Sequence, residues 1–348
     1  MAIKDLFGLG KVLPIDKLIE VISKSVGRLS KPYFDRQDID TKVYEIKKLA
    51  EAKAEEMKII SKAVHDNYQL TGGIEYKEEK ITVNSPKEIP NQNEKVLIPN
   101  SPIEERAQER LNFQEAKKQL NIESVTAFAA EELKNEQPIT DEPLDEDWTT
   151  RFFRIAEDVS NEEMQALWGK ILAGEVKQPK SYSLRTLELI RNLSKKEADI
   201  FIKVANFAIK VGDGSYIFKG NSADKLSNDF HVNYIDIAYL KELGLILPGD
   251  FVNHQFLQQP TDIQRILTAG HIVIFVQTKA NTPTVAMPVE VFSSTGNELL
   301  KLIKTTPSFD YLTYFASSIK NENVEVKYAN ILAWEGDNIR HTLPLQDL

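Results

Sequence analysis

Cysteine is absent from the 348-residue sequence, and only five histidines are present. The lack of cysteine excludes disulfide bonds, thiolate zinc sites, iron–sulfur clusters held by cysteine and a cysteine nucleophile. Long apolar runs are missing too: no stretch reaches the roughly 18 residues that a membrane-spanning helix needs, and charges interrupt the first 29 positions every few residues. The sequence therefore predicts neither a membrane span nor a signal peptide, and we expect a cytoplasmic protein.

Recognisable catalytic motifs are also lacking. The sequence contains no GxSxG nucleophile elbow and no HExxH zinc motif, and its histidines are scattered. The stretch Gly212–Gly214 follows an expected helix and precedes an expected strand, which is the reverse of the order in a phosphate-binding loop. We interpret these glycines as turn residues. The sequence thus predicts no cofactor and no bound metal, and it favours a non-enzymatic role.

Acidic residues are concentrated in one part of the chain. Residues 67–150 hold nine more acidic than basic residues, which equals the net charge of −9 of the whole chain. Proline, glycine and asparagine are frequent early in this part, where too little apolar surface is present to offset the cost of ordering the backbone. A short hairpin through Ile74–Val83 is the regular structure expected there. We expect six segments: an N-terminal helical oligomerisation or docking region at 1–71, a flexible linker at 72–102, a helical segment at 103–137, an acidic connector at 138–147, a helical core at 148–211 and a winged-helix-like α+β domain at 212–348.

The clearest periodic signal is a heptad pattern over residues 39–64, in which apolar residues recur at steps of four and three with Lys53 as the charged exception. A helix with so narrow an apolar stripe must bury it against another helix. We therefore expect a homo-oligomer in a helical hairpin or coiled coil, or docking to a protein partner. The predicted self-association residues are Val43, Ile46, Ala50, Met57, Ile60 and Val64.

A second amphipathic helix is predicted to begin at Pro14, a residue that favours the first turn, and to continue to Leu29. Two placements explain its apolar face. The face either packs against the heptad helix or lies on a membrane surface with Lys17, Lys24 and Arg28 at the headgroups.

The segment from Trp148 to Val211 reads as a set of helices. Trp148, Trp168 and Leu172 are its expected core anchors. Capping-box spacing occurs at Ser160/Glu163 and again at Ser194/Glu197, and it marks helix starts. Ser183 or Ser181 is expected to cap a helix between them, and a long helix with a joint at Asn121 or Ser124 is expected over 103–133.

The remainder of the chain mixes helices and strands. Strands are expected at 216–218, 271–278, 285–292 and 324–332, and helices at 222–230, 234–243, 295–304 and 308–320. With the helix at 194–211 counted first, the order of elements resembles a winged helix. The predicted fold class is therefore mainly α, with an α+β part at the C-terminus.

A nucleic-acid or nuclease role is the main alternative. Asp310, Glu325 and Lys327 have the order of carboxylates and lysine that some nucleases place around a divalent metal, although an alternating strand also explains the last two. Nucleic-acid binding is disfavoured, because the expected recognition helix carries Lys241 beside Asp236 and Glu242.

Basic residues are concentrated in one further region, which we interpret as a patch for an acidic partner or as ordinary solvated helix faces. The predicted partner patch consists of Arg151, Arg154, Lys170, Lys177, Lys180, Arg185 and Arg191.

Several short stretches form the most specific pattern in the chain: Asp147–Trp148, Arg151–Phe153, Asp158–Gln165, Leu167–Glu175, Ser183–Leu187 and Thr295–Leu299. Together they resemble the bacterial domain-of-unknown-function 2806 family. The resemblance implies no reaction, because this family has no assigned chemistry. The layout is also similar to that of the abortive-infection alpha proteins, which implies a setting in defence against phage. The sequence as a whole predicts a protein-interaction, scaffold or sensor protein; a nucleic-acid-binding or nuclease protein and a membrane-surface effector are its alternatives.

Overall fold

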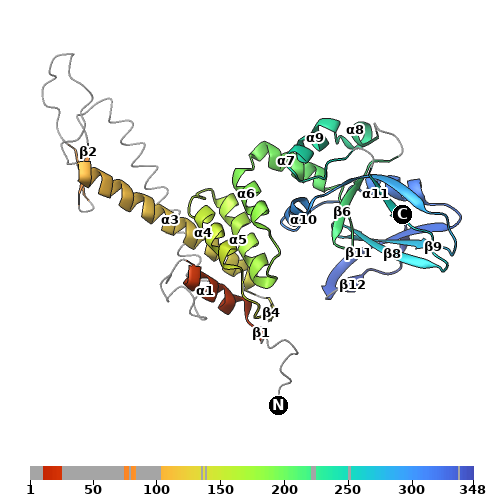
Figure 1. The fold of residues 1–348 in the computed structure, drawn as a ribbon, viewed down its shortest axis with the longest axis horizontal. Helices are drawn as coiled ribbons and strands as arrows, with labels where there is room; N and C mark the ends of the chain where they lie inside the picture. Colours follow the sequence, from red (N-terminus) through yellow and green to blue (C-terminus); the bar gives the residue numbers. More distant parts are fainter. Residues whose placement is uncertain are drawn as a thin grey trace, which may run out of the picture. The chain divides into compact units, whose positions relative to one another are not determined.

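The computed structural model divides the chain into two compact units, Met1–Pro179 and Lys180–Leu348 (Figure 1). The structure describes residues 11–25, 74–77, 80–83, 103–134, 136–137, 139–220, 225–249, 252–335 and 338–348. The predicted heptad pattern at 39–64 lies outside the described residues, as does most of the predicted linker. Within that linker, the predicted hairpin is confirmed: β2 (Ile74–Lys77) pairs antiparallel with β3 (Lys80–Val83).

The first unit is built from four described helices that enclose an aromatic core. Trp148, Trp168 and Leu172 are buried, as predicted. The ring of Phe152 stacks on Trp148 at 5.1 Å and meets the edge of Trp168 at 5.4 Å. The helices are α1 (Pro14–Ser25), α3 (Ile103–Leu133), α4 (Glu146–Ala156) and α5 (Glu162–Lys177), accompanied by the short pair β1 (Lys11–Val12) and β4 (Ile139–Thr140).

The long helix α3 has no joint, so that prediction is wrong. Asn121 and Ser124 are polar because they contact α5 and its preceding loop, not because the helix breaks. Gln165 accepts a hydrogen bond from the Ser124 hydroxyl at 2.7 Å and donates to the Asn121 side-chain oxygen at 3.2 Å. Asn121 also donates to the carbonyl of Glu157 at 2.7 Å. The predicted cap at Ser160 is likewise wrong by one residue, since Asn161 accepts from the Met164 N–H and begins α5.

Helix α1 uses its apolar face inside the first unit. Leu18 and Ile22 are buried, and the helix contacts α3, α4 and α5. The apolar stripe that suggested a membrane surface is therefore covered by protein in this structure. Within the described parts of the chain, none of the helices combines the length and the apolarity that a membrane crossing requires.

The second unit overturns the predicted fold class. Nine strands of the described residues form one sheet in the order β12-β11-β9-β8-β5-β6-β10-β7, with β13 also paired to β11, and every pairing is antiparallel. A winged helix has only a small hairpin sheet, so neither that domain type nor a mainly α fold describes the chain. The strands are β5 (Ile209–Val211), β6 (Gly214–Phe218), β7 (Asn253–Phe256), β8 (Ile263–Ala269), β9 (Ile272–Thr278), β10 (Val285–Val291), β11 (Val324–Glu335), β12 (Asn338–His341) and β13 (Gln346–Asp347).

Strand pairing explains why the sequence predicts only some of the strands of this sheet. The segment Ile209–Val211 continues the apolar pattern of the preceding helix, yet it forms β5 and pairs with β6 through a turn at Gly212, whose φ is 55°. Burial alternates along strand β7, but Phe256 is its only buried and only apolar residue, so its sequence carries no apolar alternation. Because antiparallel partners supply the hydrogen bonds of such weakly patterned segments, tertiary context decides their conformation.

The helices of the second unit begin as their caps predict. Ser183 accepts from the Thr186 N–H, and Ser194 and Glu197 form the predicted capping box. The side chain of Glu298 accepts hydrogen bonds from the Ser183 N–H at 2.7 Å and the Thr186 hydroxyl at 2.5 Å, which joins two helices. The helices are α6 (Leu184–Asn192), α7 (Lys195–Ala205), α8 (Lys225–Phe230), α9 (Tyr234–Glu242), α10 (Ser294–Leu300) and α11 (Phe309–Ile319).

Both faces of the central strand β9 are buried. One face carries Val273 and Phe275, which pack with Ala329, Ile339 and Leu345 from the C-terminal strands and tail. The opposite face belongs to the main core, where α11 lies against the sheet: the ring of Phe309 is 5.0 Å from that of Tyr328. A sheet buried on both faces holds its register firmly, so it is a rigid platform for α11.

Candidate functional site

Helix α11 divides into a buried face and a face that lines a hollow. Its buried face carries Tyr311 and Phe315, whose rings pack in the core. The hydroxyl of Tyr311 accepts a hydrogen bond from the N–H of Phe218 at 2.6 Å and donates to the carbonyl of the same residue at 3.2 Å. These bonds attach α11 to β6 and so fix the position of the face that points into the hollow.

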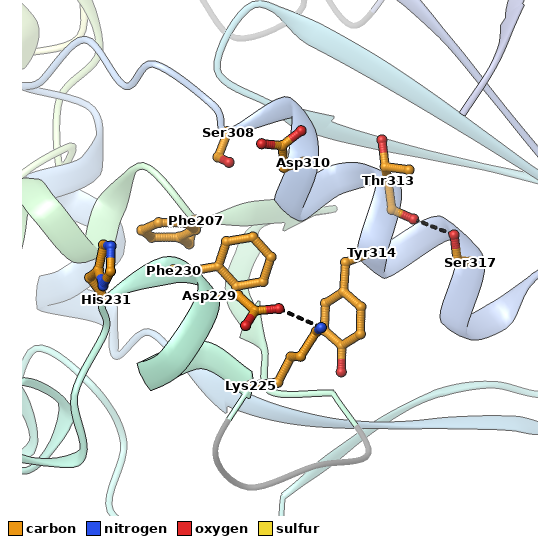
Figure 2. Close-up of a pocket in the computed structure, with 10 residues that line it drawn as sticks. All are labelled: Phe207, Lys225, Asp229, Phe230, His231, Ser308, Asp310, Thr313, Tyr314 and Ser317. Carbon is orange, nitrogen blue, oxygen red and sulfur yellow. Dashed lines mark hydrogen bonds and ion pairs between the residues drawn. The ribbon is translucent and has the colours of Figure 1, made fainter.

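The hollow lies between α8 and α11, and we call it the α8–α11 groove (Figure 2). Its volume is about 600 Å³, within the range of small-ligand sites. Its lining combines aromatic rings, hydroxyl groups and charged side chains. The lining residues are Phe207, Lys225, Asp229, Phe230, His231, Ser308, Asp310, Thr313, Tyr314 and Ser317.

Aromatic rings form one wall of the groove. The ring of Phe230 lies 5.9 Å from Phe207, 5.4 Å from Tyr311 and 5.9 Å from Tyr314, measured between ring centroids. Figure 2 shows Phe230 between Phe207 and Tyr314. Phe230 and Tyr314 are both half-buried, so part of each ring is accessible from the groove. Packed rings of this kind give a rigid apolar surface.

One cation and two carboxylates line the same hollow. Lys225 forms an ion pair with Asp229, four residues later on α8. Its ammonium also lies over the ring of Tyr314, 5.3 Å from the ring centroid. The hydrogen bond and the negative charge of Asp229 raise the pKa of Lys225, so its ammonium stays charged near neutral pH. The second carboxylate, Asp310, is exposed in the first turn of α11, where a negative charge complements the helix dipole.

Hydroxyl groups complete the wall formed by α11. Ser308 caps the helix by accepting from the Tyr311 N–H at 3.3 Å. Ser317 donates to the carbonyl of Thr313 at 2.7 Å, as the dashed line in Figure 2 shows. Groups of this type can orient a bound molecule by hydrogen bonds while the rings supply apolar contact.

The structure separates the three residues of the predicted nuclease pattern. Asp310 lines the groove, whereas Glu325 and Lys327 lie on β11 and form an ion pair with each other at 3.0 Å. Side chains alternate between the two faces of a strand. Because Tyr328 and the buried Val326 face the side that carries α11, Glu325 and Lys327 point to the opposite side of the sheet from Asp310. In the described part of the chain, no group of three or more His, Asp or Glu residues has a metal-binding arrangement.

The predicted basic patch is divided between the two units. Arg151, Arg154, Lys170 and Lys177 belong to the first unit, and Lys177 pairs with Glu136 at 2.6 Å. The others, Lys180, Arg185 and Arg191, belong to the second unit. All seven side chains are exposed.

A second hollow of about 640 Å³ lies in the first unit, between α1 and residues 141–150. Its charges are mixed: Lys17 and Lys24 face Glu20, Asp141 and Glu146. Burial lowers the pKa of Lys17, and the surrounding carboxylates, Asp141 first among them, oppose that effect. Lys17 is thus a buried cation held in an acidic environment, which stabilises the packing of α1.

Sequence reasoning named only one residue of the α8–α11 groove, Asp310. The other groove residues of α11 had a signal in the sequence. The spacing of Asp310, Thr313, Tyr314 and Ser317 places them on one side of a helix, opposite its apolar stripe. The contribution of α8 had no such signal. Phe230 meets Tyr314 only because the sheet brings together two helices that are far apart in the sequence.

The described residues define a protein of two units, one helical and one built on an antiparallel sheet with a groove against α11. The chain belongs to the family described as "Protein of unknown function (DUF2806)", whose profile matches residues 105–316. This match confirms the resemblance seen in the sequence and contains every groove residue except Ser317. No curated protein and no solved structure matches the chain significantly.

Proposed function

We propose that this chain is a non-enzymatic protein-interaction or sensor protein, and that its α8–α11 groove receives a short segment of a partner protein. The observation that carries the proposal is the exposed part of the Phe230 and Tyr314 rings inside a hollow of about 600 Å³. Aromatic residues contribute a large share of the binding energy at protein interfaces, because they bury much apolar area at a small entropic cost.

The mixed chemistry of the lining supports a peptide as the ligand. Ser308, Thr313 and Ser317 can exchange hydrogen bonds with peptide groups, and the aromatic wall can accept an apolar stem. The rigid attachment of α11 to β6 through Tyr311 supports the same conclusion. A wall that is already in place loses little conformational freedom on binding.

A setting in phage defence is part of this proposal. It is supported by the similarity in layout to the abortive-infection alpha proteins, which is a resemblance and not a contact in the structure. Its test is plaque formation on cells that express the chain, or the same chain with Thr313→Trp. We expect the wild type to reduce plaque numbers and the variant to lose this effect.

A peptide-display selection tests the groove itself. The full chain is immobilised and exposed to a library of random dodecapeptides, and the selected peptides are then measured against two variants. Thr313→Trp places a large ring in the groove, whereas Thr261→Trp makes the same change at an exposed loop position outside it. We expect the selected peptides to bind the wild type and Thr261→Trp and to lose at least tenfold in affinity for Thr313→Trp. Equal binding to all three proteins would contradict the proposal.

A further inference from the structure

We infer that the α8–α11 groove recognises a cationic side chain, the ammonium or guanidinium group of a lysine or arginine in the partner, and that Lys225 occupies the cation position when the groove is empty. This inference rests on the proposed function, because it names the chemical class of the segment that the groove receives.

Lys225 makes two contacts with residues that line the groove. Its ammonium lies over the Tyr314 ring, with 5.3 Å between the nitrogen and the ring centroid, and pairs with the carboxylate of Asp229. A cation within about 6 Å of an aromatic ring centroid is attracted by the ring, and proteins use this attraction to recognise cationic ligands. Both partners of Lys225 line the groove (Figure 2). The groove therefore already binds a cation, and that cation belongs to the same chain.

The acidic side chains that line the groove outnumber its lysine. Asp229 and Asp310 both line the groove, against the single positive charge of Lys225. Within the described residues no ion pair is recorded for Asp310. The groove consequently keeps an excess of negative charge while Lys225 is in place, and this excess doubles when its ammonium turns away. Such a lining attracts a cation and repels an anion.

The ion pair of Lys225 is exposed enough for its ammonium to be replaced by another cation. The side chains of Lys225 and Asp229 are 40% and 43% exposed, and an ion pair with that exposure contributes little free energy. The four-carbon stem of lysine can turn its ammonium into water. A ligand cation can take the place of Lys225 at Tyr314 and Asp229 while its apolar stem contacts the aromatic wall, and Asp310 on the same groove adds a negative charge that attracts it. Lys225 is thus a weak internal competitor that an external cation can displace.

Three matched peptides test the charge of the ligand. They have the sequence acetyl-Gly-Ser-X-Ser-Gly-amide, where X is lysine, norleucine or glutamate. Norleucine keeps the apolar stem of lysine and removes its charge. Binding to the full, isotope-labelled chain is followed by the NMR shifts of Tyr314, Thr313 and Ser317. We expect the lysine peptide to bind about tenfold more tightly than the norleucine peptide, equivalent to about 1.4 kcal/mol, and the glutamate peptide to bind most weakly.

Variants test the competitor and the unpaired carboxylate. Lys225→Met removes the internal cation and keeps most of the length of the side chain. Lys225→Gln is a second variant that makes the same test with a polar residue. We expect either to strengthen binding of the lysine peptide by about threefold to tenfold. Asp310→Asn should weaken it by a similar factor. The matched control is Lys304→Met, which changes an exposed lysine outside the groove. It should leave the affinity for the lysine peptide unchanged.

The outcomes separate this inference from the proposed function. If the norleucine peptide binds as well as the lysine peptide, or if both Lys225 variants leave affinity unchanged, the cation inference is wrong while a peptide groove remains. If none of the three peptides shifts the groove residues and the display selection yields no peptide that is sensitive to Thr313→Trp, the proposed function itself fails.

Discussion

Tyr311 and Phe218 are joined twice, because the tyrosine hydroxyl accepts from the N–H and donates to the carbonyl of the same residue, at 2.6 Å and 3.2 Å. Phe218 ends β6 and Tyr311 lies in the first turn of α11, so one side chain attaches the end of a strand to the start of a helix. The hydroxyl is completely buried, and burial raises the pKa of Tyr311 well above its ordinary value. The group therefore stays neutral and keeps its donor proton over the physiological range.

Tyr311→Phe should lower the free energy of unfolding by about 1–3 kcal/mol, because it leaves the buried N–H and carbonyl of Phe218 without this partner. Hydrogen exchange of the β6 and α11 amides measures the change, because a chain of two units need not unfold in one step. Tyr234→Phe removes the same hydroxyl at a position that is 80% exposed and should alter stability by less than about 0.5 kcal/mol. Equal effects of the two substitutions would show that the Tyr311 bonds contribute nothing specific.

Gly220→Ala should disturb the groove and destabilise the second unit. The residue has φ of 79°, and an added Cβ would lie 1.7 Å from the Tyr314 hydroxyl oxygen, so the ring must move. Gly212→Ala has a similar φ of 55° but open space around its Cβ, and it should cost only the conformational strain of about 1 kcal/mol. We expect Gly220→Ala to cost at least twice as much and to shift the NMR signals of Tyr314, which Gly212→Ala should leave in place.

Gln165→Leu should loosen α3 from α5 by about 1–3 kcal/mol. The side chain is 8% exposed, and its loss leaves the Ser124 hydroxyl and the Val159 carbonyl without their partner. Hydrogen exchange of the α3 and α5 amides is the suitable measurement, because a chain of two units need not unfold in one step. Gln119→Leu, on an exposed part of α3, is the control. Unchanged protection in Gln165→Leu would assign the joining of these helices to apolar packing alone.

His254 should make the second unit less stable in mild acid. Burial, and then the positive charge of Arg265, lower its pKa from the ordinary value of 6.5, while its ring stacks on Tyr216 at 4.8 Å. Since the unfolded chain binds the proton more readily, stability is complete above pH 6.5 and declines as the pH falls from 6.5 through the lower pKa of the folded state. His254→Gln should flatten the dependence of the melting temperature on pH in this window. The control His271→Gln, at an exposed position, should retain the wild-type dependence of the melting temperature on pH. If His254→Gln also retained it, the assignment of this dependence to His254 would be wrong.

Self-association remains a proposal from the heptad pattern, which lies outside the described residues. Ile46→Asp places a charge in the predicted apolar stripe and should shift the chain toward the monomer in sedimentation velocity, because a charge buried between helices is costly. Lys48→Asp introduces the same residue on the flank and should preserve the oligomer. An identical sedimenting mass for the wild type and Ile46→Asp would show that the predicted apolar stripe does not mediate self-association.

Prediction succeeded where the signal is local. Pro14 begins α1, Ser183 caps α6, and the Ser194/Glu197 capping box begins α7, because each of these depends on hydrogen bonds within one turn. It failed for β5, β7 and β8. Segment 263–269 forms β8 through seven register pairs with β9. Burial alternates along it, but Arg265 lies on the less exposed side and Ile266 on the exposed side, so the residue types do not alternate. Without these three strands, the predicted order of elements resembles a winged helix and not a large sheet.

The sequence by itself determined the helix boundaries near the caps, the core anchors Trp148, Trp168 and Leu172, and membership of the DUF2806 family. Only the tertiary structure decided that the second unit is a nine-stranded sheet in the described residues and that Lys225, Phe230 and Tyr314 line one groove. The physical reason is the range of the interactions. Caps and apolar stripes act within a few residues, whereas strand pairing and ring packing join segments whose separation in the chain carries no local signal.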